Sequence, residues 1–350
     1  MQLVTGFPKL IARRMAGALL AGSPDAQVAM LVQERHAEEG NAFVQGLPAG
    51  RARMLVGDVG SMHLGLSTAE YRELSQGCTD IVHAAEWSHL GADRLLMERV
   101  NVEGTRTALE LAQDCRKLRR FTHFSTVFVS GDRIGVVAED ELSAGQAFRN
   151  LYEETRFEAE ILVRRAMGQL PCTVLRPGIV VGDSKTGEID KFDGPYTIAI
   201  LLVMSPLQVP LPLPGDGVAP LNAVPVDFVV AASAAIHQDP RAVGRTFHLV
   251  DPNPSSSRRL YQLVAQRSGK KLPRLSLGYK LTDALLKLPG LERLSREQRM
   301  AIAYVNHLSF FSSRNTLEIL DGTGIRCPPI ESYLDNLIQY MREESGKRGP

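Results

Sequence analysis

Short runs of apolar residues alternate with longer stretches of helical periodicity through the first half of the chain. This alternation is typical of βαβ units, in which parallel strands lie between two layers of helices. The apolar runs predict strands at residues 2–5, 28–32, 54–56, 81–85, 121–125 and 172–175, and the periodic stretches predict helices at 10–20, 101–116 and 152–167. The pattern therefore predicts an α/β protein built on a doubly wound parallel sheet.

The pattern changes after Gly182. Residues 183–221 are rich in proline, which lacks a backbone donor and is unsuited to a central strand. Residues 224–230 and 246–250 resemble the main domain again, and the chain from 253 onward is helical and amphipathic. We therefore expect two domains. The larger comprises residues 1–182 and 222–252, and the smaller, mostly helical and discontinuous, comprises 183–221 and 253–350.

The composition excludes several classes of protein. Of the 350 residues 44% are hydrophobic and 23% charged, and the formal net charge is +1, which argues against a disordered chain and against nucleic-acid binding. The most apolar stretch, residues 197–204, is much shorter than the roughly 20 residues of a membrane helix. We therefore expect no integral membrane segment.

The four cysteines are far apart and form no Cys-x-x-Cys pair. We therefore expect neither a metal site nor a disulfide framework. Since the N-terminus also lacks the layout of a signal peptide, we expect a reducing, cytoplasmic location.

Candidate chemistry begins at the turn after the first expected strand. Gly6 can make this turn, and the helix that follows presents its positive end and free backbone N–H groups, which can bind a diphosphate. Lys9 stands where a further glycine would let a phosphate approach the backbone. This corner by itself is equally compatible with an ordinary connection between a strand and a helix.

Further motifs follow in a fixed order along the chain. They are Thr5-Gly6-Phe7-Pro8, Gly57-Asp58, His83-Ala84-Ala85, Asn101-Val102-Glu103-Gly104-Thr105, His123-Phe124-Ser125-Thr126, Asn150-Leu151-Tyr152, Leu175-Arg176-Pro177-Gly178 and Val224-Pro225-Val226-Asp227. In order and spacing this series, over residues 1–252, resembles the extended short-chain dehydrogenase/reductase family. The resemblance is greatest to its branch of thioester reductases and fatty acyl-CoA reductases. It implies a dinucleotide-binding Rossmann domain and NAD(P)-dependent hydride transfer to or from a carbonyl group.

The resemblance also implies roles for individual residues. Tyr152 matches the family's catalytic tyrosine, which gives a proton to the carbonyl oxygen, and Thr126 matches the hydroxyl that hydrogen-bonds the same oxygen. The cofactor positions that it implies are Gly6, Phe7, Lys9, Asp58, Ala84 and Ala85, of which Asp58 would recognise the adenine edge. Taken singly, a tyrosine in a helix is more often a core residue, and a threonine after a strand is more often a cap.

One departure from the family pattern concerns the cation that follows the tyrosine. The family has Tyr-x-x-x-Lys, whereas this chain has Arg156. Helical spacing keeps Tyr152 and Arg156 on one face, and the guanidinium still supplies positive charge that lowers the tyrosine pKa and can hold a ribose hydroxyl. Arginine does not release a proton, so a relay through this residue is blocked. Together with Lys9, this departure makes a non-catalytic NAD(P)-binding homologue the main alternative.

The choice between the two nicotinamide cofactors depends on the end of the second expected strand. Gln33 stands where an acidic residue would bind the ribose hydroxyls of NAD, and Arg35 can meet the 2′-phosphate of NADP. Glu34 would still serve NAD if the strand ended one residue later. The sequence therefore favours NADP, with NAD as the alternative.

The substrate is indicated only by apolar segments of the smaller domain. Residues 198–204, 207–214 and 281–288 can line a cleft for an apolar carbonyl compound that is lipid-like, polyketide-like or an acyl thioester, or they can simply form a core. A nucleotide-sugar epimerase or dehydratase is a further alternative within the family. A homodimer is compatible with the sequence.

Overall fold

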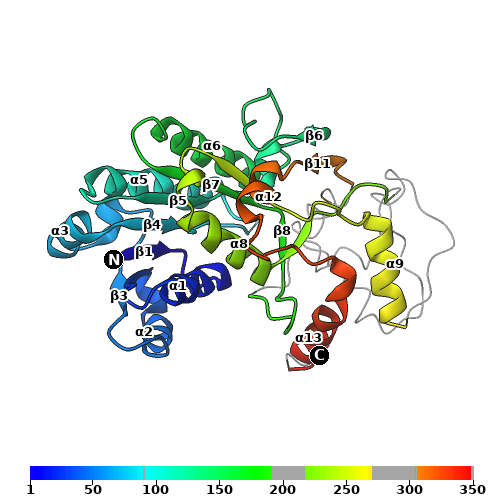
Figure 1. Cartoon of the computed structure of the whole chain (residues 1–350), viewed down its shortest axis with the longest axis horizontal. Helices are drawn as coiled ribbons and strands as arrows, with labels where there is room; N and C mark the ends of the chain where they lie inside the picture. The colour runs from blue at the N-terminus through cyan, green and yellow to red at the C-terminus, as the bar shows by residue number, and fades with distance from the viewer. Residues whose placement is uncertain (90, 191–216, 270–303, 305, 348–350) are drawn as a thin grey trace.

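A seven-stranded, wholly parallel sheet forms the centre of the protein (Figure 1). The computed structural model describes residues 1–89, 91–190, 217–269, 304 and 306–347. The strand order is β10-β7-β5-β4-β1-β2-β3. The strands are β1 (Gln2–Thr5), β2 (Val28–Val32), β3 (Ala52–Val56), β4 (Asp80–His83), β5 (Arg120–Phe124), β7 (Cys172–Pro177) and β10 (Thr246–Leu249). The expected doubly wound α/β fold is therefore confirmed.

Helices cover both faces of the sheet. The α-helices are α1 (Leu10–Gly22), α2 (Ala37–Gln45), α3 (Thr68–Gly77), α4 (Arg94–Met97), α5 (Gly104–Asp114), α6 (Leu151–Ala166), α8 (Val226–Gln238), α9 (Ser257–Arg267), α12 (Arg314–Leu320) and α13 (Leu334–Lys347). One apolar core joins the sheet to α1, α8 and α12, and a second joins the opposite face to α3, α5 and α6. Figure 1 shows α5 and α6 on one side of the strands and α1 and α8 on the other.

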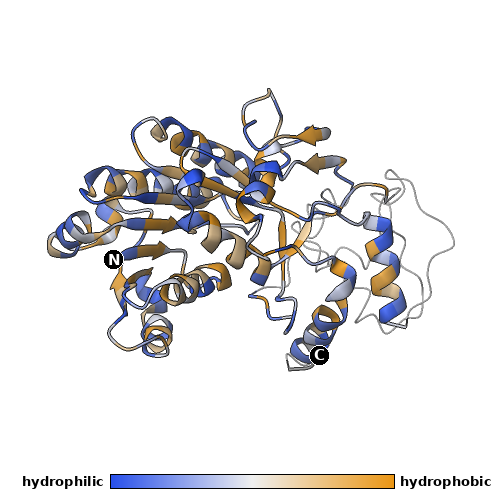
Figure 2. Cartoon of the chain, viewed as in Figure 1, coloured by the Kyte–Doolittle hydropathy of each residue, from blue (hydrophilic) through white to orange (hydrophobic). Residues whose placement is uncertain are grey.

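The strands supply both cores because successive side chains point to opposite faces. In β1, Leu3 belongs to the core beneath α5 whereas Val4 belongs to the core beneath α1. Ala29 and Met30 of β2 divide in the same way. Figure 2 shows the resulting concentration of apolar residues in the strands, with polar residues interspersed along the helices. A strand buried on both faces is apolar throughout, which explains the continuous runs in the sequence.

The order of the strands creates a crevice between β1 and β4. The chain leaves β1 for α1 on one face of the sheet and passes from β4 to α5 on the other. In doubly wound sheets, ligands bind at this point, outside the carboxyl ends of the strands. The residues that follow β1, β2, β3, β4 and β5 therefore converge on one edge of the sheet.

The structure differs from the predicted elements at several boundaries. β4 ends at His83, so Ala84 and Ala85 lie in the following loop rather than in the strand. The helix predicted for 101–116 begins as a π-helical turn, Glu98–Glu103, that leads into α5. Most of 224–230 belongs to α8, which packs against α1. The short strands β6 (Gly135–Val137), β8 (Ile179–Val181), β9 (Ala223–Pro225) and β11 (Ser309–Phe311) form two small parallel pairs, β6 with β11 and β8 with β9.

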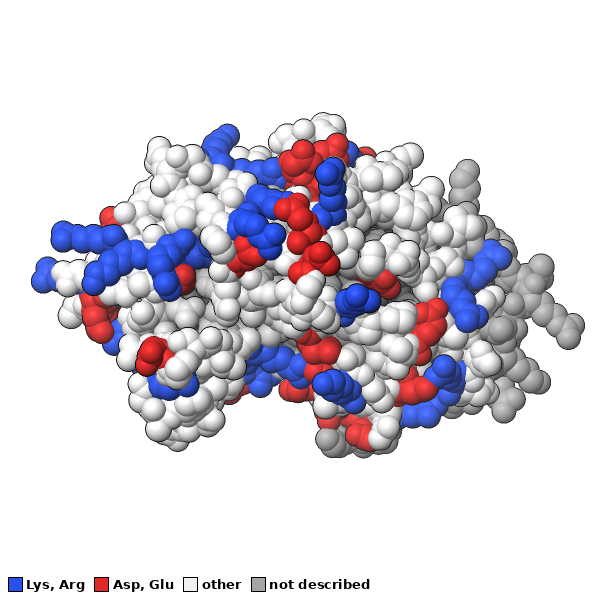
Figure 3. Space-filling view, in the orientation of Figure 1, with Lys and Arg blue, Asp and Glu red and all other residues white. Residues whose placement is uncertain are grey.

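The C-terminal segment packs in two different places. α9 and α13 share an apolar cluster with β8 and β9, whereas α12 packs against α8 and β10 on the main sheet. The apolar runs at 198–204, 207–214 and 281–288 lie outside the described residues. No helix among the described residues is both long and apolar enough to cross a bilayer. On the face shown in Figure 3, acidic and basic side chains alternate over the middle of the molecule.

A buried ion pair connects α6 to the sheet. Glu160 accepts two hydrogen bonds from Arg176 of β7, at 2.7 and 2.9 Å, and a third at 2.7 Å from Ser125. The side chains of Glu160 and Arg176 are 0% and 1% exposed. Burial alone would raise the pKa of Glu160, but Arg176 outweighs burial and the pKa falls to about 2.

We expect Glu160→Gln to lower the free energy of unfolding by about 3–5 kcal/mol, because it leaves the Arg176 guanidinium buried without its counter-charge. The contribution of this pair is present above the unfolded pKa of about 4.3 and is lost as pH falls through about 2. Urea denaturation at pH 7 and at pH 3 measures both effects. The control is Glu103→Gln, which breaks a half-exposed pair with Arg106 and should cost less than about 1 kcal/mol. Equal losses for the two variants would contradict this account.

Candidate cofactor and active site

Gly6 brings the turn after β1 against the end of β4. Its φ is +101°, and a Cβ atom built on it would lie 2.6 Å from the carbonyl oxygen of Ala84. Only glycine has neither a strained backbone nor a side chain that overlaps at this position. The predicted turn residue Gly6 and the small residues Ala84 and Ala85 are therefore in direct apposition. Phe7 is buried beside them, with its ring centroid 5.7 Å from that of Phe43.

The N-terminus of α1 holds an anionic group of the protein itself. The backbone N–H of Leu10 donates to a carboxylate oxygen of Asp190, and Arg13 donates to the other oxygen at 3.0 Å. A helix N-terminus attracts anions through its free N–H groups and its dipole. The Asp190 carboxylate thus stands in for a phosphate oxygen at the corner where the sequence predicts a diphosphate.

A cleft of about 470 Å³ opens over this corner. Its lining includes Gly6, Phe7, Lys9, Arg13, Gln33, Arg35, Ala85, Glu86 and Trp87. A second cleft of about 570 Å³ adjoins it, with Arg35 and Asp58 in its lining. Five of the predicted cofactor residues line the first cleft, and Asp58 lines the second. Ala84 belongs to the core beneath.

Asp58 lies in the loop after β3 and forms a hydrogen bond within that loop. Its carboxylate accepts a hydrogen bond from the backbone N–H of Gly60 and forms an ion pair with Arg99, both at 2.9 Å. Arg99 was not predicted as a site residue. It also lines the second cleft, so the pair forms one wall of the space predicted for adenine.

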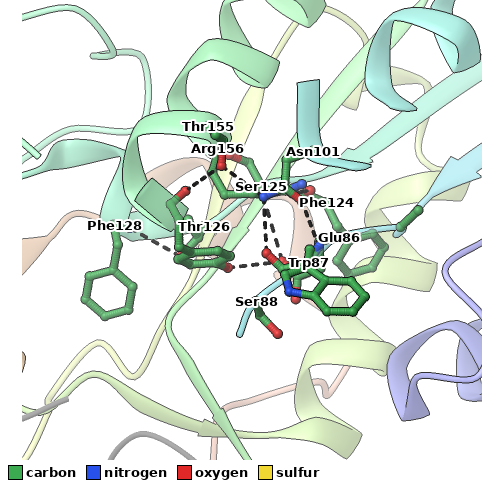
Figure 4. Close-up of polar contacts among 12 residues, drawn as sticks. Glu86, Trp87, Ser88, Asn101, Phe124, Ser125, Thr126, Phe128, Thr155 and Arg156 are labelled. Carbon is green, nitrogen blue, oxygen red and sulfur yellow. Dashed lines mark hydrogen bonds and ion pairs between the residues drawn. The ribbon is translucent and has the colours of Figure 1, made fainter. Parts of the chain in front are cut away.

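Tyr152 and Arg156 lie on the first two turns of α6. Asn150 caps this helix, since its side chain accepts a hydrogen bond at 3.0 Å from the backbone N–H of Glu153. The cap places Tyr152 and Arg156 on the helix face that meets the ends of β4 and β5. The Arg156 guanidinium is 1% exposed and donates to the carbonyl oxygen of Phe124. Figure 4 shows Arg156 between Phe124 and Glu86.

Glu86 joins the two ends of the cleft, and sequence reasoning missed it. Its Oε1 is 2.7 Å from Lys9 Nζ, and its Oε2 accepts a hydrogen bond at 3.0 Å from the hydroxyl of Tyr152. Arg156 Nε lies 3.8 Å from the same Oε2. Burial would raise the pKa of Glu86, but Lys9 and Arg156 lower it to about 2, so this group is a carboxylate. The one sequence signal was an acidic residue directly after the small pair Ala84-Ala85, which follows a buried strand.

The expected effect of a nearby cation on the pKa of Tyr152 is present but does not decide that pKa. Burial raises the pKa of Tyr152 well above its usual value, and the Glu86 carboxylate raises it further. Arg156 acts in the expected direction but is outweighed. The phenol is therefore held in its protonated form, as a hydrogen-bond donor.

Thr126 follows β5 at the same edge of the sheet. It is buried, and its hydroxyl accepts a hydrogen bond at 3.3 Å from the backbone N–H of Phe128, which caps the short 3₁₀ turn Val127–Ser130. The capping function that an isolated threonine suggests is therefore present. A hydroxyl that accepts from the backbone still has its own proton to donate.

Asn101 connects the loop after β4 to α6. Its side chain accepts from the backbone N–H of Trp87 at 2.7 Å and donates to the Trp87 carbonyl and to Thr155 at 3.1 and 2.9 Å. It lies in the π-helical turn, a departure that is frequent at functional sites. This residue thereby holds the loop that carries Glu86.

His83 and His123 are buried and neutral. Burial, with Arg156 as a second cause, lowers the pKa of His83 to about 3 and that of His123 well below its usual value. The His83 ring lies 3.0 Å from the Thr5 hydroxyl and 3.2 Å from the Thr105 hydroxyl. These contacts agree with a structural function rather than with general-base catalysis.

The residues present fit a nicotinamide dinucleotide. The glycine turn, the helix N-terminus with its stand-in carboxylate and the basic residues Lys9 and Arg13 suit a diphosphate. At the other end, the buried Nε1 of Trp87 and the buried Nε and Nη1 of Arg156 have no hydrogen-bond partner among the described residues. Donors of this kind can bind hydroxyl or amide oxygens of a ligand.

Comparisons with known proteins show the family of this chain. The model of the male sterility protein family, an NAD-binding family, matches residues 4–233. This is more than half of the chain, so the protein belongs to this family, a branch of the extended short-chain dehydrogenases/reductases. The family expected from the sequence is thereby confirmed.

Individual relatives cover much of this chain but little of their own length. One of them, a linear gramicidin synthase from Brevibacillus parabrevis, is 26% identical over 91% of this chain and 6% of that protein. Fatty acyl-CoA reductase wat from Drosophila melanogaster is 26% identical over 52% of this chain and 40% of that protein. The chain thus spans less than half the length of either curated relative. The terminal R domain of the myxalamid PKS-NRPS pathway matches with a TM-score of 0.83 and 27% identity, over 98% of this chain and 90% of that chain.

We expect Gly6→Ala to lower the free energy of unfolding by about 1–3 kcal/mol, because it adds backbone strain and an overlap with the Ala84 carbonyl. The matched control is Gly17→Ala in α1, where an added Cβ has no neighbour within 4 Å and helix propensity favours alanine by about 0.5–1 kcal/mol. Urea denaturation should therefore give changes of opposite sign. A stabilising Gly6→Ala would contradict the close approach of β1 and β4.

Proposed function

We propose that this protein is an NAD(P)H-dependent reductase that transfers hydride to the carbonyl group of an apolar substrate. The observation that carries the proposal is the placement of Tyr152, whose hydroxyl lies at the carboxyl ends of β4 and β5 and contacts a residue of the cofactor cleft. A bound nicotinamide would supply the hydride. Tyr152 donates its proton to the carbonyl oxygen, and the Thr126 hydroxyl donates a hydrogen bond to the same oxygen.

The remaining site residues bind and orient the cofactor. Gly6, Phe7 and the N-terminus of α1 hold the diphosphate, with Lys9 nearby and Ala84 and Ala85 leaving room for the nicotinamide end. Asp58 contacts the adenine edge, where it lines the second cleft. Arg156 supplies positive charge beside the nicotinamide ribose, from a position 3.8 Å from the Glu86 carboxylate.

NADP is our proposed cofactor, in preference to NAD. Gln33 stands directly after β2, where it cannot repel a phosphate, and Arg35 follows in an exposed turn that lines both clefts. Glu34 is the residue that would favour NAD. An exposed guanidinium at this place is well suited to a 2′-phosphate.

The substrate class rests on the relatives and on the apolar character of the smaller domain. A fatty acyl-CoA reductase is among the relatives, and its name is compatible with an acyl thioester as substrate. We propose that residues 183–221 and 253–350 bind this substrate over the dinucleotide-binding domain formed by 1–182 and 222–252. Within this segment β11 pairs with β6 and α12 packs against α8 and β10 of the main domain.

Tyr152→Phe should lower kcat by about 10²–10⁴, because the phenylalanine has no proton to donate. The assay follows NADPH absorbance with a medium-chain aldehyde and with an acyl-CoA thioester, and fluorescence titration measures the affinity for NADPH. The affinity should be unchanged. Tyr71→Phe is the control, since that hydroxyl contacts Asp114 away from the cleft. Undiminished turnover by Tyr152→Phe would refute the proton role, and no turnover by the native protein would favour a non-catalytic homologue.

Arg35→Ala should weaken NADPH binding by about ten- to a hundredfold, since a hydrogen bond to a charged group contributes about 1.5–3 kcal/mol. NADH binding should be unaffected, because NADH lacks the 2′-phosphate. Arg72→Ala, which removes an exposed arginine of α3, is the control for the loss of a positive charge. If Arg35→Ala weakened both cofactors equally, Arg35 would not contact the 2′-phosphate.

A further inference from the structure

Arg156 stands where the family has a lysine. The residue four positions after Tyr152 is therefore no source of protons for the proposed reaction. A guanidinium remains charged at any pH at which the protein is folded, so Arg156 does not return a proton to Tyr152. Arg156 is also 1% exposed and donates to the Phe124 carbonyl, and so has no contact with bulk water. The proton that Tyr152 gives away must therefore return by another route.

We propose that Glu86 is the proton partner of Tyr152 and that Lys9 connects Glu86 to solvent. The inference rests on the proposed reductase function and assigns Glu86 and Lys9 as positioning residues of that site. It depends on three side chains that come from different parts of the chain, the turn after β1, the loop after β4 and the start of α6.

The contacts form a continuous chain of hydrogen bonds. The Tyr152 hydroxyl is 3.0 Å from Glu86 Oε2, and Glu86 Oε1 is 2.7 Å from Lys9 Nζ. Lys9 also donates to the Ser88 hydroxyl at 3.1 Å, which fixes the ammonium group over the carboxylate. All three side chains are partly buried, and those of Glu86 and Lys9 are 23% and 34% exposed, so the Lys9 end of this chain of contacts reaches solvent. Figure 4 shows Glu86 directed toward Arg156, with Ser88 further along the same loop.

The charges favour the direction of transfer. At rest Glu86 is a carboxylate and Tyr152 a neutral phenol. When Tyr152 gives its proton to the carbonyl oxygen, a phenolate forms beside the carboxylate, and two adjacent anions bind a shared proton tightly. After this step the Tyr152–Glu86 pair bears one more negative charge than at rest, and the Lys9 ammonium lies next to it.

The proton steps balance as follows. As hydride from the proposed nicotinamide cofactor forms the new C–H bond, the Tyr152 O–H bond breaks and an O–H bond forms on the former carbonyl oxygen. A proton passes from Lys9 Nζ to the Glu86 carboxylate and from Glu86 to the phenolate oxygen. Lys9, left as a neutral amine, takes a proton from water. The hydride supplies both electrons of the reduction, and the path supplies one proton.

The first test measures the ionisation of Tyr152 without cofactor or substrate. Ultraviolet difference titration of the native protein against Tyr152→Phe isolates the absorbance change of this phenol. Glu86→Gln removes the negative charge and leaves Arg156, so the apparent pKa of Tyr152 should fall in that background. Glu86→Asp, which keeps the charge, should restore part of the difference, and Glu38→Gln on the exposed face of α2 should have no effect. An unchanged Tyr152 pKa in Glu86→Gln would overturn the proposal.

The second test measures the path itself. With NADPH and a medium-chain aldehyde, Glu86→Gln and Lys9→Met should each lower kcat by about 10–100-fold, less than the loss of the acid itself. Both should show a larger solvent deuterium isotope effect than the native protein, and Glu86→Asp should recover part of kcat. KM for the aldehyde should be unchanged. Native kcat and isotope effect in Glu86→Gln would overturn the path while the reductase function stands, whereas inactivity of the native protein would overturn the function and the path together.

Discussion

The close approach of Gly6 to the end of β4 is the constraint on which the cofactor end of the structure depends. A side chain on Gly6 would overlap the backbone of Ala84, so only a glycine lets the first turn and the loop after β4 approach this closely. This contact sets the position of α1, whose N-terminus attracts an anion, and of the loop that carries Glu86. The diphosphate end and the reaction end of the site are thereby fixed relative to each other.

Buried charges hold the other side of the site, and each is paired with groups from another element. Glu160 and Arg176 join α6 to β7, and Arg156 joins α6 to the end of β5 and to Glu86. Because an unpaired charge in this environment is costly, each pair fixes the rotation of α6. The orientation of Tyr152 follows from that rotation and from the Asn150 cap.

The three unusual residues of the site form one compensated group. Lys9 stands in place of a glycine, Arg156 in place of a lysine, and Glu86 lies between them as their common counter-charge. Without Glu86, the two positive charges would lie in the cleft without this shared carboxylate partner. This mutual dependence explains why two departures that weaken the site when considered singly coexist with a fold and family that match reductases along most of the chain.

The sequence by itself determined the strands of the sheet, the helix that carries Tyr152 and Arg156, and the glycine turn. These features depend on the alternation of apolar runs with stretches of helical periodicity and on the glycine that makes the first turn. Such patterns reflect interactions between near neighbours in the chain. The tertiary structure alone decided that Glu86 meets Lys9 and Tyr152, since these contacts join residues 77 and 66 positions apart. It also decided the direction of the Tyr152 pKa, because burial and a neighbouring carboxylate outweigh the expected effect of Arg156 and have no counterpart in the local pattern.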